Sequence, residues 1–211
     1  IKEFGPVLRV GGGHNFSIDN TEIISSGKVK RDIDPYYNLF YLLELNGNTG
    51  ESTILTLNEN SKISVNSNLT GATLFFNYKA DTKLKFTNEG SITINSKKDE
   101  RYGNSFATTF MNTGASKDLS TFLNKGNISI EGQVDSVIYD AFGLSSYYHF
   151  VNEGNIKISG KNNTGINVSD IISDRIKKVS VLQLNNPFIV DGESSTGFYF
   201  RKIKRDRKSN S

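Results

Sequence analysis

The chain has 211 residues, enough for a sizeable hydrophobic core, and it contains no cysteine, so disulfide bonds and thiolate chemistry are excluded. The lack of cysteine fits either a reducing compartment or a secretion route that keeps the chain unfolded in transit. The formal net charge of +3 arises at one end, because residues 201–211 sum to +5 and residues 1–200 to −2, so the body of the chain lacks the basic surface of a nucleic-acid-binding protein.

Asparagine, with 24 residues, and glycine, with 19, are abundant, whereas proline occurs 3 times and methionine once. Together with the β-branched residues between them, they favour many short strands joined by turns, and few helices. No run of 18 apolar residues is present, so a membrane-spanning helix is not expected. The sequence shows no signal peptide and begins at Ile1, and we therefore expect a piece cut from a longer protein.

Residues 1–49 fit the pattern of the remaining chain poorly, and we predict that they form an atypical N-terminal turn or cap. The glycine-rich segment 11–14 lacks the spacing of a phosphate-binding loop and is expected to be a flexible start of the first turn. Segment 19–27 is a candidate degenerate repeat around Ile24. The run 36–45 is the most hydrophobic of the chain, and its periodicity is compatible with either a buried strand or a short helix.

A repeat organises residues 50–200. Its pattern is Phe-x-Asn-[Glu/Lys]-Gly-[Ser/Asn]-Ile-x-Ile. Weaker copies begin at Leu57 and at Leu182, and in the second of these Asn186 replaces the glycine, as expected for a position at positive φ. The positions of the three clear copies that we expect to carry the structure are Phe86, Asn88, Gly90, Ile92, Phe122, Asn124, Gly126, Ile128, Phe150, Asn152, Gly154 and Ile156.

Apolar and polar residues alternate within each copy, which is the pattern of a strand with one buried face. The Asn-x-Gly step in the middle is predicted to be a corner, with glycine at positive φ. A second corner is expected near Gly132, Gly160 or Gly192, before a strand led by Thr-Gly. Three such strands make one turn of a coil. The sequence therefore predicts an all-β protein, a right-handed parallel β-helix of about six turns with loop insertions.

Stacked turns place equivalent residues above one another, about 4.8 Å apart. The corner asparagines of the three clear copies can then form a ladder of side-chain amides. The first anchoring residues after the corner are expected to fill the core in one column, formed by Ile63, Ile92, Ile128, Ile156 and Phe188.

The intervals between these anchoring residues are 29, 36, 28 and 32 residues. The longest interval, from Ile92 to Ile128, contains the polar, glycine-broken segment 97–104, which predicts a protruding loop. Insertions of a repeat protein often lie on its binding face, and Arg101 and Tyr102 are then candidate binding residues. A tolerated surface insertion without a binding role is the alternative.

Three columns of outward-facing residues can be assembled from the repeat. The one that lies three residues before the anchoring aromatic is mostly apolar, which indicates a strip that faces a partner or is covered by a loop, with Leu119 and Tyr147 as candidate binding residues. Alternatively, a shift of strand parity buries this column. Its members are Ile54, Lys83, Leu119, Tyr147 and Val179. The column next to the aromatic contains Thr56, Lys85, Thr121, His149 and Val181, and the column after the corner contains Ser64, Thr93, Ser129, Lys157 and Ile189.

Candidate catalytic and metal-binding residues are sparse. His14 and His149 lack neighbours with metal-ligand spacing, and Ser105 lacks the context of a nucleophile elbow. We expect no cofactor and no metal. A carbohydrate-active lyase or hydrolase needs clustered acids on one sheet face. The outward columns contain none, but four carboxylates in less certain segments could cluster, which keeps the enzyme as an alternative: Asp135, Asp140, Asp170 and Asp174.

The Asn-x-Gly-x-Ile-x-Ile turns, the richness in asparagine and lysine and the lack of cysteine resemble the passenger domains of autotransporters (type V secretion) of Gram-negative bacteria. The likeness is greatest to the large fusobacterial-type adhesins and covers residues 50–200. It implies a right-handed parallel β-helix that is exported through an outer-membrane barrel and displayed at the cell surface or outside the cell as a virulence-related adhesin. The implied partner is a host or bacterial surface protein or a glycan.

We therefore predict a surface-displayed adhesin fragment without a nucleic-acid partner and without direct insertion into a membrane. The alternatives are the carbohydrate-active β-helix enzyme and a structural stalk that binds nothing. The basic tail 201–211 is expected to be a solvated end or the start of a linker, although such a tail can also bind nucleic acid or anionic lipid.

Overall fold

The computed structural model describes residues 8–11, 13–27, 40–46, 52–67, 72–77, 83–96, 107–111, 120–133, 139–144, 148–170, 179–183 and 185–202. These residues form strands β1 to β19 in three sheets, and they contain no helix. All pairs of neighbouring strands are parallel. The prediction of an all-β protein with parallel strand pairing is confirmed.

The first sheet contains, in spatial order, β1 (Leu8–Gly11), β4 (Phe40–Asn46), β7 (Ala72–Asn77), β10 (Ala107–Met111), β13 (Tyr139–Leu144), β16 (Asn163–Asp170) and β19 (Thr196–Lys202). The second sheet contains β2 (Asn15–Ile18), β5 (Ser52–Leu57), β8 (Lys83–Asn88), β11 (Ser120–Asn124), β14 (Tyr148–Asn152) and β17 (Val179–Gln183). The third sheet contains β3 (Glu22–Gly27), β6 (Lys62–Ser67), β9 (Ser91–Ser96), β12 (Asn127–Gln133), β15 (Asn155–Lys161) and β18 (Phe188–Asp191).

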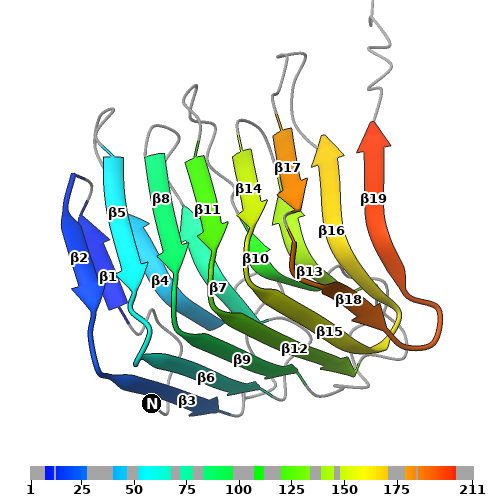
Figure 1. The fold of residues 1–211 in the computed structure, drawn as a ribbon, viewed down its shortest axis with the longest axis horizontal. Coiled ribbons are helices and arrows are strands. Elements are labelled where there is room, and N and C mark those ends of the chain that lie inside the picture. The colour runs from blue at the N-terminus through cyan, green and yellow to red at the C-terminus, as the bar shows by residue number, and fades with distance from the viewer. Residues whose placement is uncertain are drawn as a thin grey trace, which may run out of the picture.

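Each strand pairs with the strands three places before and after it in the chain. We call three consecutive strands, one from each sheet and starting in the first sheet, a unit. The described strands make six units, from β1–β3 to β16–β18, and β19 follows the sixth. Figure 1 shows the strands of the second and third sheets side by side along the long axis of the molecule, from β2 and β3 to β17 and β18. The chain thus visits the three sheets in turn and advances by one strand in each.

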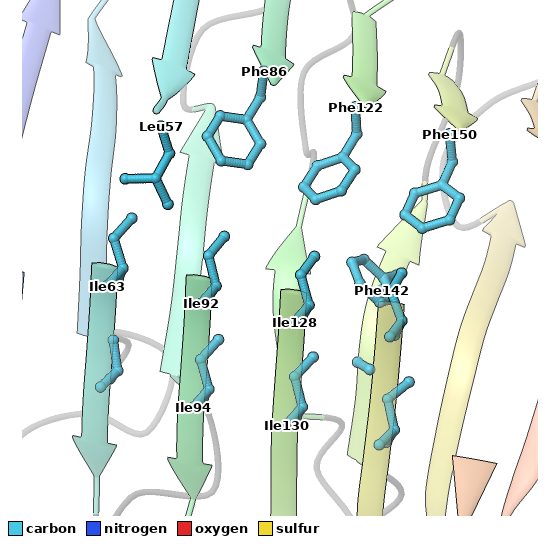
Figure 2. Packing of buried hydrophobic residues seen from close by; sticks show 14 of the residues in the cluster. Leu57, Ile63, Phe86, Ile92, Ile94, Phe122, Ile128, Ile130, Phe142 and Phe150 are labelled. Atoms are coloured by element: carbon cyan, nitrogen blue, oxygen red, sulfur yellow. The ribbon is translucent and has the colours of Figure 1, made fainter. Parts of the chain in front are cut away.

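The core is filled by columns of identical or similar side chains, one from each unit. Ile63, Ile92, Ile128, Ile156 and Phe188 lie in register across the third sheet, as predicted. The next inward column, two residues on, consists of Val65, Ile94, Ile130, Ile158 and Val190. The isoleucines of both columns are at most 2 % exposed. Figure 2 shows Ile63, Ile92 and Ile128 side by side along the sheet. Each fully buried isoleucine contributes about 1.5–3 kcal/mol, so these columns dominate the stability.

Aromatic rings continue the core toward the second sheet. Phe86, Phe122 and Phe150 are paired in register, and the ring centroids are 5.1 Å apart between the first two and 5.3 Å apart between the last two (Figure 2). Phe142 reaches them from the first sheet and meets Phe150 edge-on at 4.9 Å. One core therefore joins all three sheets.

A ladder of buried amides lies at the corner between the second and third sheets. Nδ2 of Asn88 donates to Oδ1 of Asn124 at 2.6 Å, and Nδ2 of Asn124 donates to Oδ1 of Asn152 at 2.7 Å. All three side chains are fully buried, and the predicted ladder is confirmed. Asn124 and Asn152 also donate to the carbonyl oxygens of the corner glycines, Gly126 and Gly154.

The corner glycines serve a different purpose from the predicted one. Gly90, Gly126 and Gly154 are not among the described residues with positive φ. Glycine is needed there because successive corners lie directly on one another: a Cβ at Gly126 would overlap the carbonyl oxygen of Gly90, and a Cβ at Gly154 would overlap that of Gly126. The prediction of positive φ at this corner is wrong.

Among the described glycines of the repeat, positive φ occurs at the second corner, between the third sheet and the first. Gly160 has φ of 117° and Gly192 of 139°, and they are followed by Asn162 at 52° and Ser194 at 57°. The strands after this corner pair as the repeat predicts, with Thr164 opposite Thr196.

The weaker repeat copy at Leu57 is aligned differently from the prediction. Leu55 pairs with Phe86, and Leu57 pairs with Asn88. The cause is a corner of four residues, 58–61, where each clear copy has two. The buried Ser61 holds this longer corner, because its hydroxyl donates to the carbonyl oxygen of Ile18 at 2.8 Å and accepts from the backbone N–H of Thr21 at 3.2 Å.

The copy at Leu182 is also shifted, by one residue. Val181, not Leu182, pairs with Phe150. The residue with positive φ in the following corner is Asn185, at 39°, rather than Asn186. Asn186 instead donates from Nδ2 to the carbonyl oxygen of Glu153 in the preceding unit.

Residues of the N-terminal region add strands to the same three sheets. β1, β2 and β3 pair with β4, β5 and β6. The degenerate copy is present, but Ile23 occupies the inward column opposite Ile63, whereas Ile24 points outward and is 65 % exposed. Within the hydrophobic run 36–45, residues from Phe40 onward form a strand rather than a helix.

Candidate functional site

The four predicted binding residues, Arg101, Tyr102, Leu119 and Tyr147, lie outside the residues that the structure describes. The same holds for Ser105 and for the carboxylates Asp135 and Asp174. Their proposed roles stay predictions, and the candidate surface has to be built from the strands.

The predicted apolar column on the second sheet was assembled with the wrong register. Ile54 pairs with Lys85 rather than Lys83, and Val179 pairs with Tyr148. The longer corner at 58–61 and the one-residue shift at Val181 cause both errors. The column through Lys85 consists of Asn15, Ile54, Lys85, Thr121, His149 and Ser180, which is mostly polar.

Apolar outward positions do occur on the second sheet, one residue further along. Leu123 and Val151 face away from the core and pair with each other across β11 and β14. Leu123 is half-buried, and Val151 is only 8 % exposed. This part of the outer surface is therefore already largely covered and offers little free apolar area.

The outer face of the third sheet is polar across four units. We call its outward residues on β6, β9, β12 and β15 the polar face. They alternate with the buried isoleucines and valine and are small or long polar side chains: Lys62, Ser64, Asn66, Ser91, Thr93, Asn95, Asn127, Ser129, Glu131, Asn155, Lys157 and Ser159. The sequence had already placed Ser64, Thr93, Ser129, Lys157 and the apolar Ile189 in one outward column, and the register confirms it.

Amide side chains on the polar face bond along the stack. Nδ2 of Asn95 donates to Oδ1 of Asn66 at 2.9 Å, and Nδ2 of Asn155 donates to Oδ1 of Asn127 at 3.0 Å. Each amide has further donor and acceptor capacity, since an amide side chain can form up to four hydrogen bonds. The sequence signal for this face was the alternation of Ser, Thr and Asn with Ile in every clear copy.

Ion pairs join neighbouring units at the margins of the stack. Nζ of Lys62 lies 2.9 Å from Glu22, Nζ of Lys125 lies 3.2 Å from Glu89, and Nζ of Lys161 lies 3.5 Å from Glu193. The side chains of all three pairs are partly exposed, so each pair adds at most about 1 kcal/mol. Each pair joins a lysine of one unit to a glutamate of the neighbouring unit. The pairs therefore support the strand register and do not create a charged binding site.

The described residues hold no group of three or more His, Cys, Asp or Glu that could bind a metal ion. His14 is exposed, and His149 is half-buried between Thr121 and Ser180 in the outward column of the second sheet. Of the carboxylates considered for catalysis, Asp140 pairs with Thr164 and Asp170 with Lys202, so the register does not bring these two together. On the described strands, Asp140 and Asp170 therefore do not form a catalytic pair.

No protein-family model matches the chain, no curated protein matches its sequence, and no solved structure matches its fold. In the described part of the chain, no helix has the length and apolar character needed to cross a membrane.

Proposed function

We propose that the chain is a right-handed parallel β-helix, in other words a solenoid, and that it belongs to the passenger domain of a Gram-negative autotransporter. Its role is that of an adhesin, displayed at the bacterial cell surface, that binds a protein or glycan of a host or bacterial surface. The observation that carries this proposal is the uninterrupted register of the strands, in which every sheet is extended by each successive unit.

The proposed right-handedness is supported by the connections between strands. Each strand returns to its own sheet after passing through the other two, and parallel crossovers of this kind are right-handed in about 98 % of cases. A stack of this type is stabilised by contacts between neighbouring units and needs no disulfide bonds, which agrees with a chain that has no cysteine.

The polar face is the surface that we assign to adhesion. Its side chains are held on strands whose other faces are buried, so their positions are fixed before a partner arrives and little entropy is lost on binding. Serine and threonine hydroxyls and asparagine amides donate and accept hydrogen bonds, which suits the hydroxyl groups of a glycan or the backbone of a protein. Lys157 and Glu131 add one charge of each sign.

Binding of the purified, fluorescently labelled chain to bacterial and host cells tests this assignment. Thr93→Arg places a bulky side chain in the middle of the polar face, next to Ser64 and Ser129. Thr87→Arg is the matched control, because Thr87 points outward from the second sheet between Thr56 and Leu123. We expect the first variant to lose about tenfold or more in affinity and the control to bind normally.

Equal binding by Thr93→Arg and the unmodified chain would refute the polar face as the adhesive surface. Failure of the unmodified chain to bind any cell would favour the stalk. Surface display is tested separately by protease treatment of intact Gram-negative cells that produce the full-length protein. Cleavage of the region containing residues 50–200 supports export, and complete protection contradicts it.

A further inference from the structure

The polar face lies on the side of the stack, so its exposure does not depend on where the described residues begin or end. Its strands β6, β9, β12 and β15 are flanked within the third sheet by β3 at one end and β18 at the other (Figure 1). Asn127 and Ser129 in its middle are exposed, and Thr93 is half-buried. The polar face is therefore accessible to a ligand.

A column of hydroxyl groups runs through the centre of the polar face, parallel to the axis of the stack. Ser64, Thr93 and Ser129 form it, one from each of three consecutive units, and we call them the hydroxyl column. Neighbouring strands of a sheet are about 4.8 Å apart, which is close to the length of one sugar ring in an extended glycan. A linear glycan that lies along the column therefore meets a hydroxyl group with each successive ring.

Two bonded pairs of amides flank the hydroxyl column on opposite sides. Asn66 and Asn95 lie two residues after it on β6 and β9, with Nδ2 of Asn95 2.9 Å from Oδ1 of Asn66. On the other side, Asn127 lies two residues before it on β12, and Nδ2 of Asn155 lies 3.0 Å from Oδ1 of Asn127. These bonds orient the amides, and each amide keeps further donor and acceptor capacity. A glycan on the column therefore has hydrogen-bonding groups along both of its edges.

The polar face carries no excess of charge of either sign. Glu131 and Lys157 have opposite charges, and Nζ of Lys62 lies 2.9 Å from a carboxylate oxygen of Glu22. The remaining residues of the polar face are serine, threonine and asparagine. An acidic polysaccharide would need a surplus of positive charge to attract it, so the polar face favours an uncharged glycan.

The residue types of the polar face argue against a protein as the ligand. The centres of protein–protein interfaces are enriched in aromatic residues, methionine and arginine, and tryptophan, tyrosine and arginine dominate the binding energy. None of the residues of the polar face belongs to these types. Its hydroxyl and amide groups instead match the hydroxyl groups of a sugar, each of which donates and accepts hydrogen bonds.

We propose that the ligand of the polar face is an uncharged, linear glycan that lies along the hydroxyl column, parallel to the axis of the stack. This inference rests on the adhesive role proposed above, and it adds the chemical class and the direction of the ligand. The rings contact the hydroxyl column, and the edges of the glycan contact the two amide pairs.

Competition tests the chemical class of the ligand. Cells to which the labelled chain binds are digested with protease, and the released carbohydrate is separated by anion exchange into an uncharged and an acidic pool. Deglycosylated protein from the same cells is the third competitor. We expect the uncharged pool to displace the chain from the cells and the other two to leave it bound. If the uncharged pool does not compete, the proposed ligand class is refuted, while the adhesive role of the polar face stands. If the chain binds no cell, both proposals fail.

Thr93→Val tests the contact with the hydroxyl column. Valine has nearly the shape of threonine, so this variant removes the hydroxyl group alone. We expect the affinity for the cells to fall about fivefold, because the glycan loses one hydrogen bond. Thr87→Val, on the outer side of the second sheet, is the matched control and should bind as the unmodified chain does. Unchanged or tighter binding by Thr93→Val would contradict the hydroxyl column as the contact surface.

Ser64→Ala and Ser129→Ala test the direction of the glycan, because these residues lie in the column one unit before and one unit after Thr93. Each should lower the affinity by a similar factor. Ser91→Ala is the control, since Ser91 lies on the same strand as Thr93 but outside the column. A loss of affinity with Ser91→Ala and none with the two column variants would show a ligand that lies along one strand, and it would overturn the proposed direction.

Discussion

The side-chain amides of Asn124 and Asn152 are hydrogen-bonded to each other at 2.7 Å inside the core, where both side chains are fully buried. A buried amide is costly unless its donors and acceptor are paired, and here each unit supplies the partner for the next. The ladder begins at Asn88, whose Oδ1 has no partner, because the position before it in the column holds Leu57. The ladder therefore couples the register of three units at one corner.

The first prediction concerns this ladder. Asn124→Ala removes both inter-unit bonds, so Nδ2 of Asn88 loses its acceptor and Oδ1 of Asn152 loses a donor in the core. We expect the free energy of unfolding to fall by about 3 kcal/mol, as measured by urea denaturation. Asn95→Ala is the matched control, because it breaks an amide bond of similar length on the surface, where water replaces the partner. Its cost should stay below about 0.5 kcal/mol, and equal losses would contradict the account.

The second prediction concerns the isoleucine column. Ile128→Asp places a carboxylate between Ile92 and Ile156, in a column of side chains that are at most 2 % exposed. We expect a loss of more than about 4 kcal/mol or failure to fold, seen as a lowered melting temperature and rapid proteolysis.

Ser129→Asp is the adjacent control, since Ser129 points outward next to Lys157. This variant should melt within a few degrees of the unmodified chain. A normal melting temperature for Ile128→Asp would show that Ile128 does not lie in the column.

The repeat made the core predictable because identical residues at identical positions have only one way to be buried together. Phe86, Phe122 and Phe150 lie in register for this reason, as do the isoleucines after the corner. The sequence-based alignment of the repeat copies failed where the corner between the second and third sheets has a different length. The position of Leu57 depends on Ser61, whose hydroxyl bonds to the backbone of Ile18, a residue 43 positions earlier. No local pattern carries that information.

The corner glycines illustrate a second limit of prediction from the sequence. A glycine in a sequence can indicate positive φ or a close approach of backbone, and one sequence does not distinguish the two. Gly126 is required by a close approach of the backbone, whereas Gly160 has positive φ. For the candidate site, alternation predicted the outward column of Ser64, Thr93 and Ser129. The apolar column was misplaced because it depended on the copies with unusual corners.

The third prediction separates these causes. Gly126→Ala forces a methyl group into the carbonyl group of Gly90, and neither backbone can move without breaking strand pairing. We expect a loss of about 3 kcal/mol or more in chemical denaturation. Gly197→Ala has open space and φ outside the positive range, so it should be neutral or stabilising by about 0.5 kcal/mol through the unfolded state. A cost for Gly197→Ala as large as that for Gly126→Ala would contradict the stacking explanation.

The last prediction concerns the ion pairs that link successive units. Lys125 and Glu89 belong to neighbouring corners, and Nζ lies 3.2 Å from Oε1 with both side chains partly exposed. Charges in this position gain little in water and lose rotamer entropy, so a double-mutant cycle with alanine at both positions should give a coupling of about 0.5 kcal/mol. The coupling should shrink when the salt concentration rises to about 1 M, where the screening length is about 3 Å.

Lys161 and Glu193 offer the comparison, because their charged atoms are 3.5 Å apart and their side chains are more exposed. Their coupling should be smaller still. A coupling above about 1.5 kcal/mol for Lys125 and Glu89, unchanged by salt, would mean that this pair is effectively desolvated and holds the units together. The stability of the stack would then rest partly on its margins, and the core columns and the buried amide ladder would no longer be sufficient to explain it.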